Sequence, residues 1–512
     1  MTMGNAMYVL VAGQWRQSRA TDFFQAENPA TGEFLPPRFP ISPREEALEA
    51  LRAGAEAAEA LRGVDSETIA RFLETFAARI EERAESLVEA AHNETALPKT
   101  PRLKDVELPR TTDQLRQAAR VARDGSWQRP VRHEARKIYS IYAPLGGPVI
   151  VMGPNNFPFA YNSAAGGDFA AAIVARNPII AKANSSHPFT TQMFADLAFA
   201  ASQACGLPPA TIQLLYRTSR DLGFEMVGHP LVGATAFTGS RDAGLQLKAA
   251  ADRAGKPIYL EMSSINPVVL LEGALRERGE AIAAEFCASC TAGVGQFCTS
   301  PGLVILPAGE LGDRFVEAAR QKLEAAPPGV LLGGGVRERL VHAVAKLREN
   351  GAEILCGGGA LPGPAAQFAN TLLTVSAAGF LRHPEELQTE AFGPVSLLVR
   401  CDGTDEIAKV LRHIAGNLTG TIYSSAAGAD DAAYATLEPQ LRARVGRLVN
   451  DKMPTGVAVS PAMNHGGPFP ATGHPGFTAV GLPASVQRFT ALQCYDNVPE
   501  HRLPRELRAE KN

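Results

Sequence analysis

The sequence has few cysteines and no cysteine framework. Seven cysteines are spread over 512 residues, and only Cys287 and Cys290 are spaced like one half of a metal-binding motif. Because no second pair or histidine cluster accompanies them, we interpret both as core residues on one helix face and expect no metal site. Scattered cysteines fit a reducing compartment, so we expect a cytoplasmic protein.

Long apolar runs and a surplus of one charge are also missing. No apolar window is long enough to cross a bilayer, and Met1 to Leu10 lacks the basic and apolar regions of a secretory leader. The formal net charge is -3, which gives no reason to expect nucleic acid or an anionic membrane as a partner. With 45% hydrophobic residues, a chain of this length predicts a globular protein of two or three domains.

Two familiar phosphate-binding motifs, GxGxxG and the P-loop, do not occur where a nucleotide site would need them. The glycine-rich stretches at Leu331–Gly335 and Gly357–Gly359 contain no lysine, so we predict surface loops there. The sequence does contain Phe237-Thr238-Gly239-Ser240 before a helical pattern over Arg241–Ala251. A glycine that opens a helix in this way can seat a diphosphate, although the same residues also suit an ordinary strand-to-helix turn.

From Val149 onward, apolar runs alternate with helical patterns. Units of this size predict a parallel sheet covered by helices on both faces, and therefore an α/β fold. The predicted strands are Val149–Met152, Pro178–Ala181 and Ile212–Tyr216, and the helices between them are Ala164–Ala175 and Thr190–Cys205. A second α/β segment is predicted from Pro267 to Ser460. Before the alternation we predict an edge hairpin within residues 8–40 and helices over Glu45–Leu61, Ile69–His92 and Leu108–Ala122.

Two other segments are predicted to stand apart from these layers. Val131–Ala143 alternates polar and β-favouring residues, which predicts an antiparallel excursion from the main sheet. The charged tail Pro499–Asn512 is expected to be frayed.

Cys298 lies in a sequence context that favours an accessible nucleophile. A helical run over Glu280–Cys290 precedes it, and an apolar run over Leu303–Leu306 follows. A free cysteine is more often a buried structural residue. Here glycines at 293, 295 and 302 and a proline at 301 would let a ligand approach the thiol closely.

Two further residues offer complementary chemistry. Glu261 follows a strand-like run in an apolar and small-residue setting, where a carboxylate can serve as a base. Asn156, in a tight loop, could donate its amide to an oxyanion or could simply hold the turn. His187 and His465 have no clear partner, and we interpret them as loop structure rather than catalytic groups.

In combination and in this order, these motifs resemble the aldehyde dehydrogenase superfamily, from Gly13-Gln14-Trp15 near the start to His465-Gly466-Gly467-Pro468 near the end. The resemblance implies that Cys298 attacks an aldehyde, that Asn156 and the Cys298 backbone N–H hold the oxyanion, and that Glu261 activates water to hydrolyse the thioester. It also implies a Rossmann-like cofactor domain (1–130 and 148–265), a catalytic domain (266–460) and an oligomerisation arm (131–147 and 484–498) that builds a homodimer or homotetramer.

The resemblance further implies a nicotinamide dinucleotide cofactor. Lys182 matches the family's adenosine-ribose lysine, and Glu390 matches its ribose-holding glutamate. Phe392 would lie beside the nicotinamide. Gly239 and Ser240 match the motif that binds the diphosphate in the family's variant of the dinucleotide fold.

Two positions indicate NADP rather than NAD, although NAD stays possible. Ser185 stands where NAD-using relatives place a glutamate that would repel a 2′-phosphate. Arg220 matches an arginine that NADP-using fatty aldehyde dehydrogenases place against that phosphate. The alternative for Arg220 is an ion pair with Asp221 at a helix start.

The substrate is less sharply indicated than the chemistry. Pro454–Val459 and His465–Thr472 resemble the branch that oxidises 2,5-dioxovalerate (α-ketoglutaric semialdehyde), and Gly295–Thr299 is shared with a fatty aldehyde branch. The implied substrate is a small aldehyde, such as this semialdehyde, and medium- or long-chain aliphatic or aromatic aldehydes are the alternative. Glu261 disfavours an acylating enzyme that releases its thioester to coenzyme A, and the retained Cys298 disfavours an inactive binding or structural relic.

Overall fold

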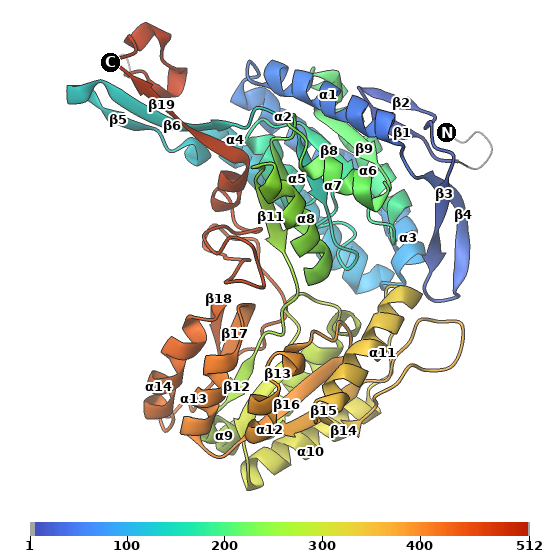
Figure 1. The fold of residues 1–512 in the computed structure, drawn as a ribbon, viewed down its shortest axis with the longest axis vertical. Coiled ribbons are helices and arrows are strands. Elements are labelled where there is room, and N and C mark those ends of the chain that lie inside the picture. Colours follow the sequence, from blue (N-terminus) through green and yellow to red (C-terminus); the bar gives the residue numbers. More distant parts are fainter. Residues whose placement is uncertain (1–5, 510–512) are drawn as a thin grey trace.

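A computed structural model describes residues 6–509, which form two lobes and a projecting arm (Figure 1). Each lobe is built on a seven-stranded sheet with helices against it, and the arm is a three-stranded sheet. This architecture confirms the predicted α/β class. Within the described residues, no helix combines the length and the apolar character that crossing a membrane would require.

The first sheet has the strand order β11-β10-β7-β8-β9-β1-β2. Its five parallel strands are apolar and almost completely buried, as expected for strands covered on both faces; they are β7 (Val149–Met152), β8 (Ile179–Lys182), β9 (Ile212–Leu215), β10 (Ala234–Thr238) and β11 (Ile258–Glu261). The antiparallel edge comes from the start of the chain, as β1 (Val9–Val11) and β2 (Gln14–Arg16). A separate hairpin follows, formed by β3 (Phe23–Asn28) and β4 (Glu33–Pro40).

Eight α-helices belong to the part of the chain that forms this sheet. They are α1 (Arg44–Leu61), α2 (Ser66–Glu82), α3 (Ala84–Thr95), α4 (Leu108–Asp124), α5 (Gly167–Val174), α6 (Pro188–Ala204), α7 (Arg220–Val227) and α8 (Arg241–Arg253). The prediction of one helix over Ile69–His92 is wrong. Arg83 leaves helical geometry with φ -108° and ψ 15°, and the chain continues there as a second helix.

The second sheet has the order β14-β15-β16-β13-β12-β17-β18, with only β14 antiparallel. Its strands are β12 (Val268–Leu270), β13 (Leu303–Pro307), β14 (Glu353–Cys356), β15 (Thr371–Ser376), β16 (Val395–Cys401), β17 (Asn417–Tyr423) and β18 (Val445–Asn450). Its helices are α9 (Glu272–Thr291), α10 (Glu310–Ala325), α11 (Gly334–Glu349), α12 (Ala377–Arg382), α13 (Thr404–His413) and α14 (Asp431–Arg442).

Two predictions about this lobe have different outcomes. Cys287 and Cys290 are buried on α9 in one apolar cluster with Phe286, which confirms them as core residues. The prediction of a surface loop at Leu331–Gly335 is wrong, because the side chains of both leucines are buried and Gly334 already begins α11.

The arm consists of β5 (Val131–His133), β6 (Ile138–Pro144) and β19 (Thr490–Asp496), in the order β19-β6-β5. The antiparallel register runs from Thr490 opposite Pro144 to Asp496 opposite Ile138. Within the described chain β19 has one neighbouring strand, and its Leu492 side chain is 62% exposed.

The expectation of a frayed tail is wrong for most of its length. Leu503 and Leu507 are buried against Tyr139 and Ile141 of the arm. The residues at 510–512 lie outside the described chain, as do residues 1–5 of the stretch inspected for a secretory leader.

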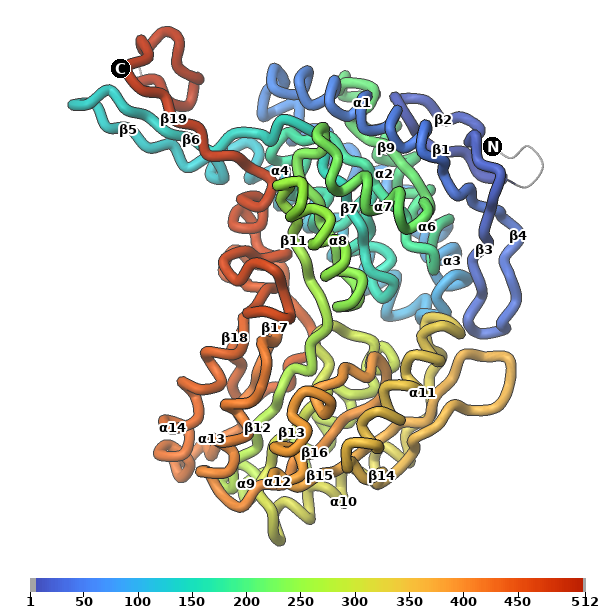
Figure 2. Tube along the Cα trace, viewed as in Figure 1, coloured from blue at the N-terminus to red at the C-terminus, as the bar shows by residue number. Residues whose placement is uncertain are grey.

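The lobes are connected at the point where chemistry was predicted. Figure 2 shows the chain leaving β11 of the upper lobe and entering β12 of the lower lobe directly. A later segment returns beside the same crossing, because Met262 N donates to Ala471 O at 2.8 Å and Glu261 bridges to Thr472. Residues more than 200 positions apart in the chain are therefore brought together between the lobes.

Candidate active site

The loop that carries Cys298 is held in place by hydrogen bonds to its backbone and by close packing. Asn266 donates its side-chain amide to the carbonyls of Cys298 and Ser300, each at 2.9 Å. Gly295 has φ +68°, and a Cβ there would lie 2.1 Å from the Gly393 carbonyl oxygen, so only glycine fits. The sequence analysis missed Asn266. Its position directly before a proline at a strand start was the available clue.

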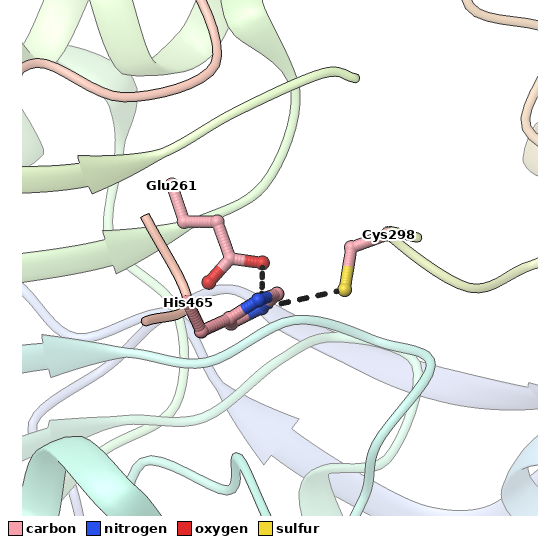
Figure 3. Close-up of side chains that lie close together, drawn as sticks. All are labelled: Glu261, Cys298 and His465. Carbon is pink, nitrogen blue, oxygen red and sulfur yellow. Dashed lines mark hydrogen bonds and ion pairs between the residues drawn. The ribbon is translucent and has the colours of Figure 1, made fainter. Parts of the chain in front are cut away.

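Cys298, His465 and Glu261 lie in contact with one another (Figure 3). His465 Nε2 is 3.5 Å from Cys298 Sγ and 2.9 Å from Glu261 Oε1. The prediction that His465 is merely loop structure is therefore wrong. The returning segment places it there, and Thr478 Oγ1 accepts a hydrogen bond from its backbone N–H at 2.8 Å. This long-range contact left no local pattern in the sequence.

The surroundings of the thiol favour its neutral form. Burial raises the pKa of Cys298 well above its ordinary value, and the Glu261 carboxylate raises it further. The positive charge of Arg110 partly offsets this rise in the thiol pKa. Since a thiolate is needed for nucleophilic attack, a proton acceptor beside the sulfur is required, and the His465 imidazole is in contact with it.

The same three side chains could also bind a metal ion. Their sulfur, nitrogen and oxygen atoms all lie within 4.8 Å of one another. Thiolate, imidazole and carboxylate together suit a borderline-soft ion such as Zn²⁺. The arrangement thus offers either a nucleophile with its base or three ligands, and a bound ion would block the nucleophile.

Asn156 serves the fold and also faces the thiol region. It is 6% exposed, and its amide donates to Gln296 O at 2.8 Å, which leaves one amide hydrogen for a ligand. It lines the same cavity as Cys298. His187, which is buried with Nε2 2.9 Å from Pro154 O, holds the preceding loop, and its structural interpretation is confirmed.

A cavity of about 490 Å³ opens between the lobes in front of Cys298. Ser240 begins α8 there and accepts a hydrogen bond from Ala243 N, so the helix N-terminus faces the cavity. The residues named from the sequence that line it are Asn156, Gly239, Ser240, Glu261, Cys298, Glu390 and Phe392. The volume of this cavity is in the range of small-molecule sites, and a helix N-terminus faces it.

Comparison with known proteins decides the family. Residues 15–462 match the model of the Aldehyde dehydrogenase family. The chain belongs to the aldehyde dehydrogenase family. It is 40% identical over 495 residues to alpha-ketoglutaric semialdehyde dehydrogenase 2 of Azospirillum brasilense, covering 94% of this chain and 93% of the relative. It is 35% identical to alpha-ketoglutaric semialdehyde dehydrogenase of Acinetobacter baylyi, covering 86% and 84%.

Solved structures agree on the aldehyde dehydrogenase fold. Lactaldehyde dehydrogenase from Escherichia coli superposes with a TM-score of 0.83 at 22% identity, covering 96% of this chain and 98% of that one. A mutant of aldehyde dehydrogenase C from Pseudomonas syringae, complexed with NAD⁺ and octanal, gives 0.82 at 19% identity and covers 97% of each chain. At these identities the likeness concerns the fold.

Within this aldehyde dehydrogenase, the remaining predicted cofactor residues, which are Lys182, Ser185 and Arg220, are not among the residues that line the cavity. Lys182 ends β8, and burial with the nearby Arg217 charge lowers its pKa to about 8. Ser185 is exposed, whereas its neighbours Asn184 and Ser186 line the cavity.

Arg220 begins α7 on the exposed surface of the aldehyde dehydrogenase. Its guanidinium contacts Gln246 and lies 5.7 Å from the Phe224 ring centroid, so the alternative pairing with Asp221 is not observed. Arg339 on α11 lines the cavity and was missed, because the preceding glycine-rich stretch was interpreted as a surface loop.

Glu390 lies in the lobe of the second sheet and lines the cavity, and its carboxylate is hydrogen-bonded. Its carboxylate accepts from Ser264 N at 3.1 Å. Burial raises its pKa above the ordinary value, and the hydrogen bonds from Ser263 and Ser264 oppose that rise. The polar loop after β11 thus supports this carboxylate.

Proposed function

We propose that this aldehyde dehydrogenase oxidises a carboxylate-bearing semialdehyde such as 2,5-dioxovalerate to the dicarboxylic acid, with NADP preferred over NAD. The observation that carries the chemistry is the contact of Cys298, His465 and Glu261 at the mouth of the cavity. The names of the two relatives at 40% and 35% identity support the substrate. The scattered cysteines support a cytoplasmic location.

Acylation begins at the Cys298 sulfur. The sulfur attacks the aldehyde carbon while its proton passes to the lone pair of His465 Nε2. The N–H formed there then donates to Glu261 Oε1, and the carboxylate stabilises the imidazolium. The free amide hydrogen of Asn156 and the Cys298 backbone N–H stabilise the oxyanion, and one such donor contributes about 2.7–4 kcal/mol. Bound in the cavity, a nicotinamide dinucleotide supplies the hydride acceptor for this oxidation.

Deacylation uses the same pair of side chains. Glu261, with His465 against it, accepts a proton from water as the water oxygen attacks the thioester carbon. The carbon–sulfur bond breaks and the acid leaves. The proton on Glu261 then passes to the Cys298 sulfur, and the proton that His465 accepted during acylation is released to solvent. Glu261 Oε2 is buried without a partner in the described chain, so one carboxylate oxygen stays available for this water.

The cofactor is proposed to lie across both lobes. Gly239 and Ser240 at the start of α8 would hold the diphosphate, and Lys182, Glu390 and Phe392 would orient the riboses and the nicotinamide. This assignment supports a cofactor domain of 1–130 and 148–265 and a catalytic domain of 266–460.

NADP preference is supported on the surface near Arg220. Its guanidinium faces Gln246 rather than a carboxylate, so its full charge can serve a 2′-phosphate. The Ser185 hydroxyl is exposed and could donate to the same phosphate.

Assembly is proposed to use the arm, residues 131–147 and 484–498. The outer edge of β19 has unpaired backbone groups in the described chain, and Val131 and Leu492 are exposed apolar residues on this small sheet. Such an edge is an aggregation hazard unless another subunit covers it. A homodimer or homotetramer would remove that hazard.

A panel of aldehydes run with both cofactors tests the proposal. Reduced-cofactor absorbance would give kcat/KM for 2,5-dioxovalerate, octanal and benzaldehyde with NADP and with NAD. The expected order places 2,5-dioxovalerate with NADP first. A higher kcat/KM for octanal or benzaldehyde would instead support the alternative of a medium-chain or aromatic aldehyde dehydrogenase.

A further inference from the structure

A second group of side chains lies beside the Cys298 loop, and none of them lines the large cavity. Phe157, Tyr161 and Phe297 form an aromatic cluster with ring centroids 5.2–5.3 Å apart for the two pairs that Phe157 makes. The Tyr161 ring lies 6.0 Å from that of His465, which contacts the Cys298 sulfur. The cluster is therefore directly next to the reacting thiol.

Three arginines surround this cluster, but only one of them has an acidic partner. Arg102, 4.5 Å from the Phe157 centroid, forms an ion pair with the buried Glu107. Arg110 lies 5.5 Å from the Tyr161 centroid, and Arg447 comes from β18. Within residues 6–509, no carboxylate lies at ion-pair distance from Arg110 or Arg447.

Both unpaired guanidinium groups are fixed by the loop at 454–457. Arg110 donates to Val457 O at 2.5 Å and to the Tyr161 hydroxyl at 3.2 Å. Arg447 donates to Gly456 O at 2.9 Å and to Pro454 O at 2.6 Å. The loop is tied to the nucleophile segment, because Gly456 N donates to Thr299 Oγ1 at 3.2 Å.

These contacts leave several N–H donors of each arginine unused. The Nε atoms of Arg110 and Arg447 are buried and have no acceptor in the described chain. Neutral carbonyls and the Tyr161 hydroxyl accept from the Nη groups but leave two positive charges uncompensated. A half-buried charge without a counter-ion is costly, whereas a carboxylate suits the planar donor groups of arginine.

We propose that Arg110 and Arg447 form the subsite that binds the carboxylate of the semialdehyde substrate, with the aldehyde end at Cys298 and the carbon chain against the aromatic cluster. This inference rests on the proposed function and assigns its specificity to two residues. A merely structural role, in which the arginines only hold the loop at 454–457, makes a different prediction, because it does not distinguish charged from neutral aldehydes.

The test compares two aldehydes of equal chain length, 5-oxopentanoate and pentanal, in the full-length enzyme. Wild type should favour 5-oxopentanoate. Arg110→Met and Arg447→Met should each lose about 10- to 100-fold in kcat/KM for 5-oxopentanoate, mainly through KM, since hydrogen bonds to charged groups have this strength. Pentanal kinetics should change by less than about threefold, because a neutral chain does not use the charge.

Arg444→Met is the matched control. It removes the same charge three residues before Arg447, from a guanidinium that donates to Arg412 O on the surface. It should leave both aldehydes unchanged. Arg110→Lys and Arg447→Lys keep the charge and should retain more 5-oxopentanoate activity than the methionine variants if these fold poorly.

Equal losses for both aldehydes in the methionine and lysine variants, or a wild type that does not discriminate, would overturn the carboxylate subsite. Inhibition of the wild-type enzyme tests the subsite without any variant. Pentanoate should inhibit aldehyde oxidation at least about tenfold more strongly than pentanamide. Equal inhibition by the two would also overturn it. Failure of the proposed function has a separate signature, which is no aldehyde oxidation with either cofactor while pentanoate still raises the Tm more than pentanamide.

Discussion

The two regions next to Cys298 differ in how they carry charge. The large cavity is lined mainly by neutral polar groups, a helix N-terminus and the carboxylates of Glu261 and Glu390, with Arg339 as a charged residue at its exposed side. The aromatic cluster region instead presents Arg110 and Arg447 without acidic partners. One region suits a large ligand bound through many backbone and hydroxyl groups, and the other suits a small anion bound through charge.

In the proposed function, this difference lets one thiol serve two anionic ligands without attracting both to the same place. Helix ends and hydroxyls bind phosphate over a broad surface, whereas paired arginines recognise one carboxylate strongly. Cys298 and His465 lie where the two regions meet. Substitutions can therefore disable either this meeting point or one of the two regions.

Removal of the thiol should have the largest effect. Cys298→Ala leaves both regions intact but no nucleophile, so oxidation should fall below about 1% of wild type while cofactor binding is retained. Reduced-cofactor absorbance and fluorescence titration with NADP measure the two properties. Cys494→Ser, which changes an exposed cysteine, is the control and should be fully active. Activity above that level would rule out covalent catalysis through Cys298.

Substitutions of Glu261 and His465 should slow two different steps of the reaction. Glu261→Gln should keep a burst of reduced cofactor that is slower than in wild type, because the imidazolium loses its counter-ion, and slow turnover should follow because water activation is lost. His465→Gln should slow the burst itself by about 10²- to 10⁴-fold, because the thiol proton loses its acceptor. Stopped-flow absorbance distinguishes the two traces. A normal burst in His465→Gln would remove the imidazole from thiol activation.

Arg220→Ala should weaken only the binding of the 2′-phosphate of NADP. We expect kcat/KM for NADP to fall by about 10- to 100-fold and that for NAD to stay within threefold, because only NADP carries the 2′-phosphate. Arg253→Ala, at the exposed end of α8, is the matched control. Equal losses with both cofactors, or a wild type that prefers NAD, would contradict the assignment.

The smallest effect concerns the electrostatic balance at the thiol. Because burial and Glu261 raise the pKa of Cys298, the rate of alkylation by iodoacetamide should still rise above about pH 9. Glu261→Gln should move this profile to lower pH, and Arg110→Met should move it to higher pH. Mass spectrometry of the Cys298 peptide would measure the rates in a Cys494→Ser background. An unchanged profile in both variants would show that these charges do not act on the thiol.

The sequence predicted those parts of the molecule that depend on local patterns. The strand Val149–Met152 is observed with the predicted bounds, and the α/β class followed from the alternation that begins there. Glu261, Asn156 and Cys298 were found because each lies in a recognisable motif at a chain turn. The cavity brings these three together.

Residues that act through distant contacts were not predicted. His465 meets Cys298 across 167 positions, and Arg110 meets Val457 across 347. Neither contact affects periodicity or turn composition, so no local pattern could reveal it. Asn266 was missed for a related reason, because its amide supports backbone carbonyls 32 and 34 positions away rather than any side chain.

The position of the arm has a practical consequence for purification. In Figure 1 the described chain ends beside β19, whereas it begins at the opposite side of the same lobe, near β1 and β2. An affinity tag or fluorescent protein fused at the C-terminus would stand next to the unpaired strand edge and should impede subunit pairing. A fusion at the N-terminus should leave assembly unaffected, and size-exclusion chromatography of the two fusions would show the difference.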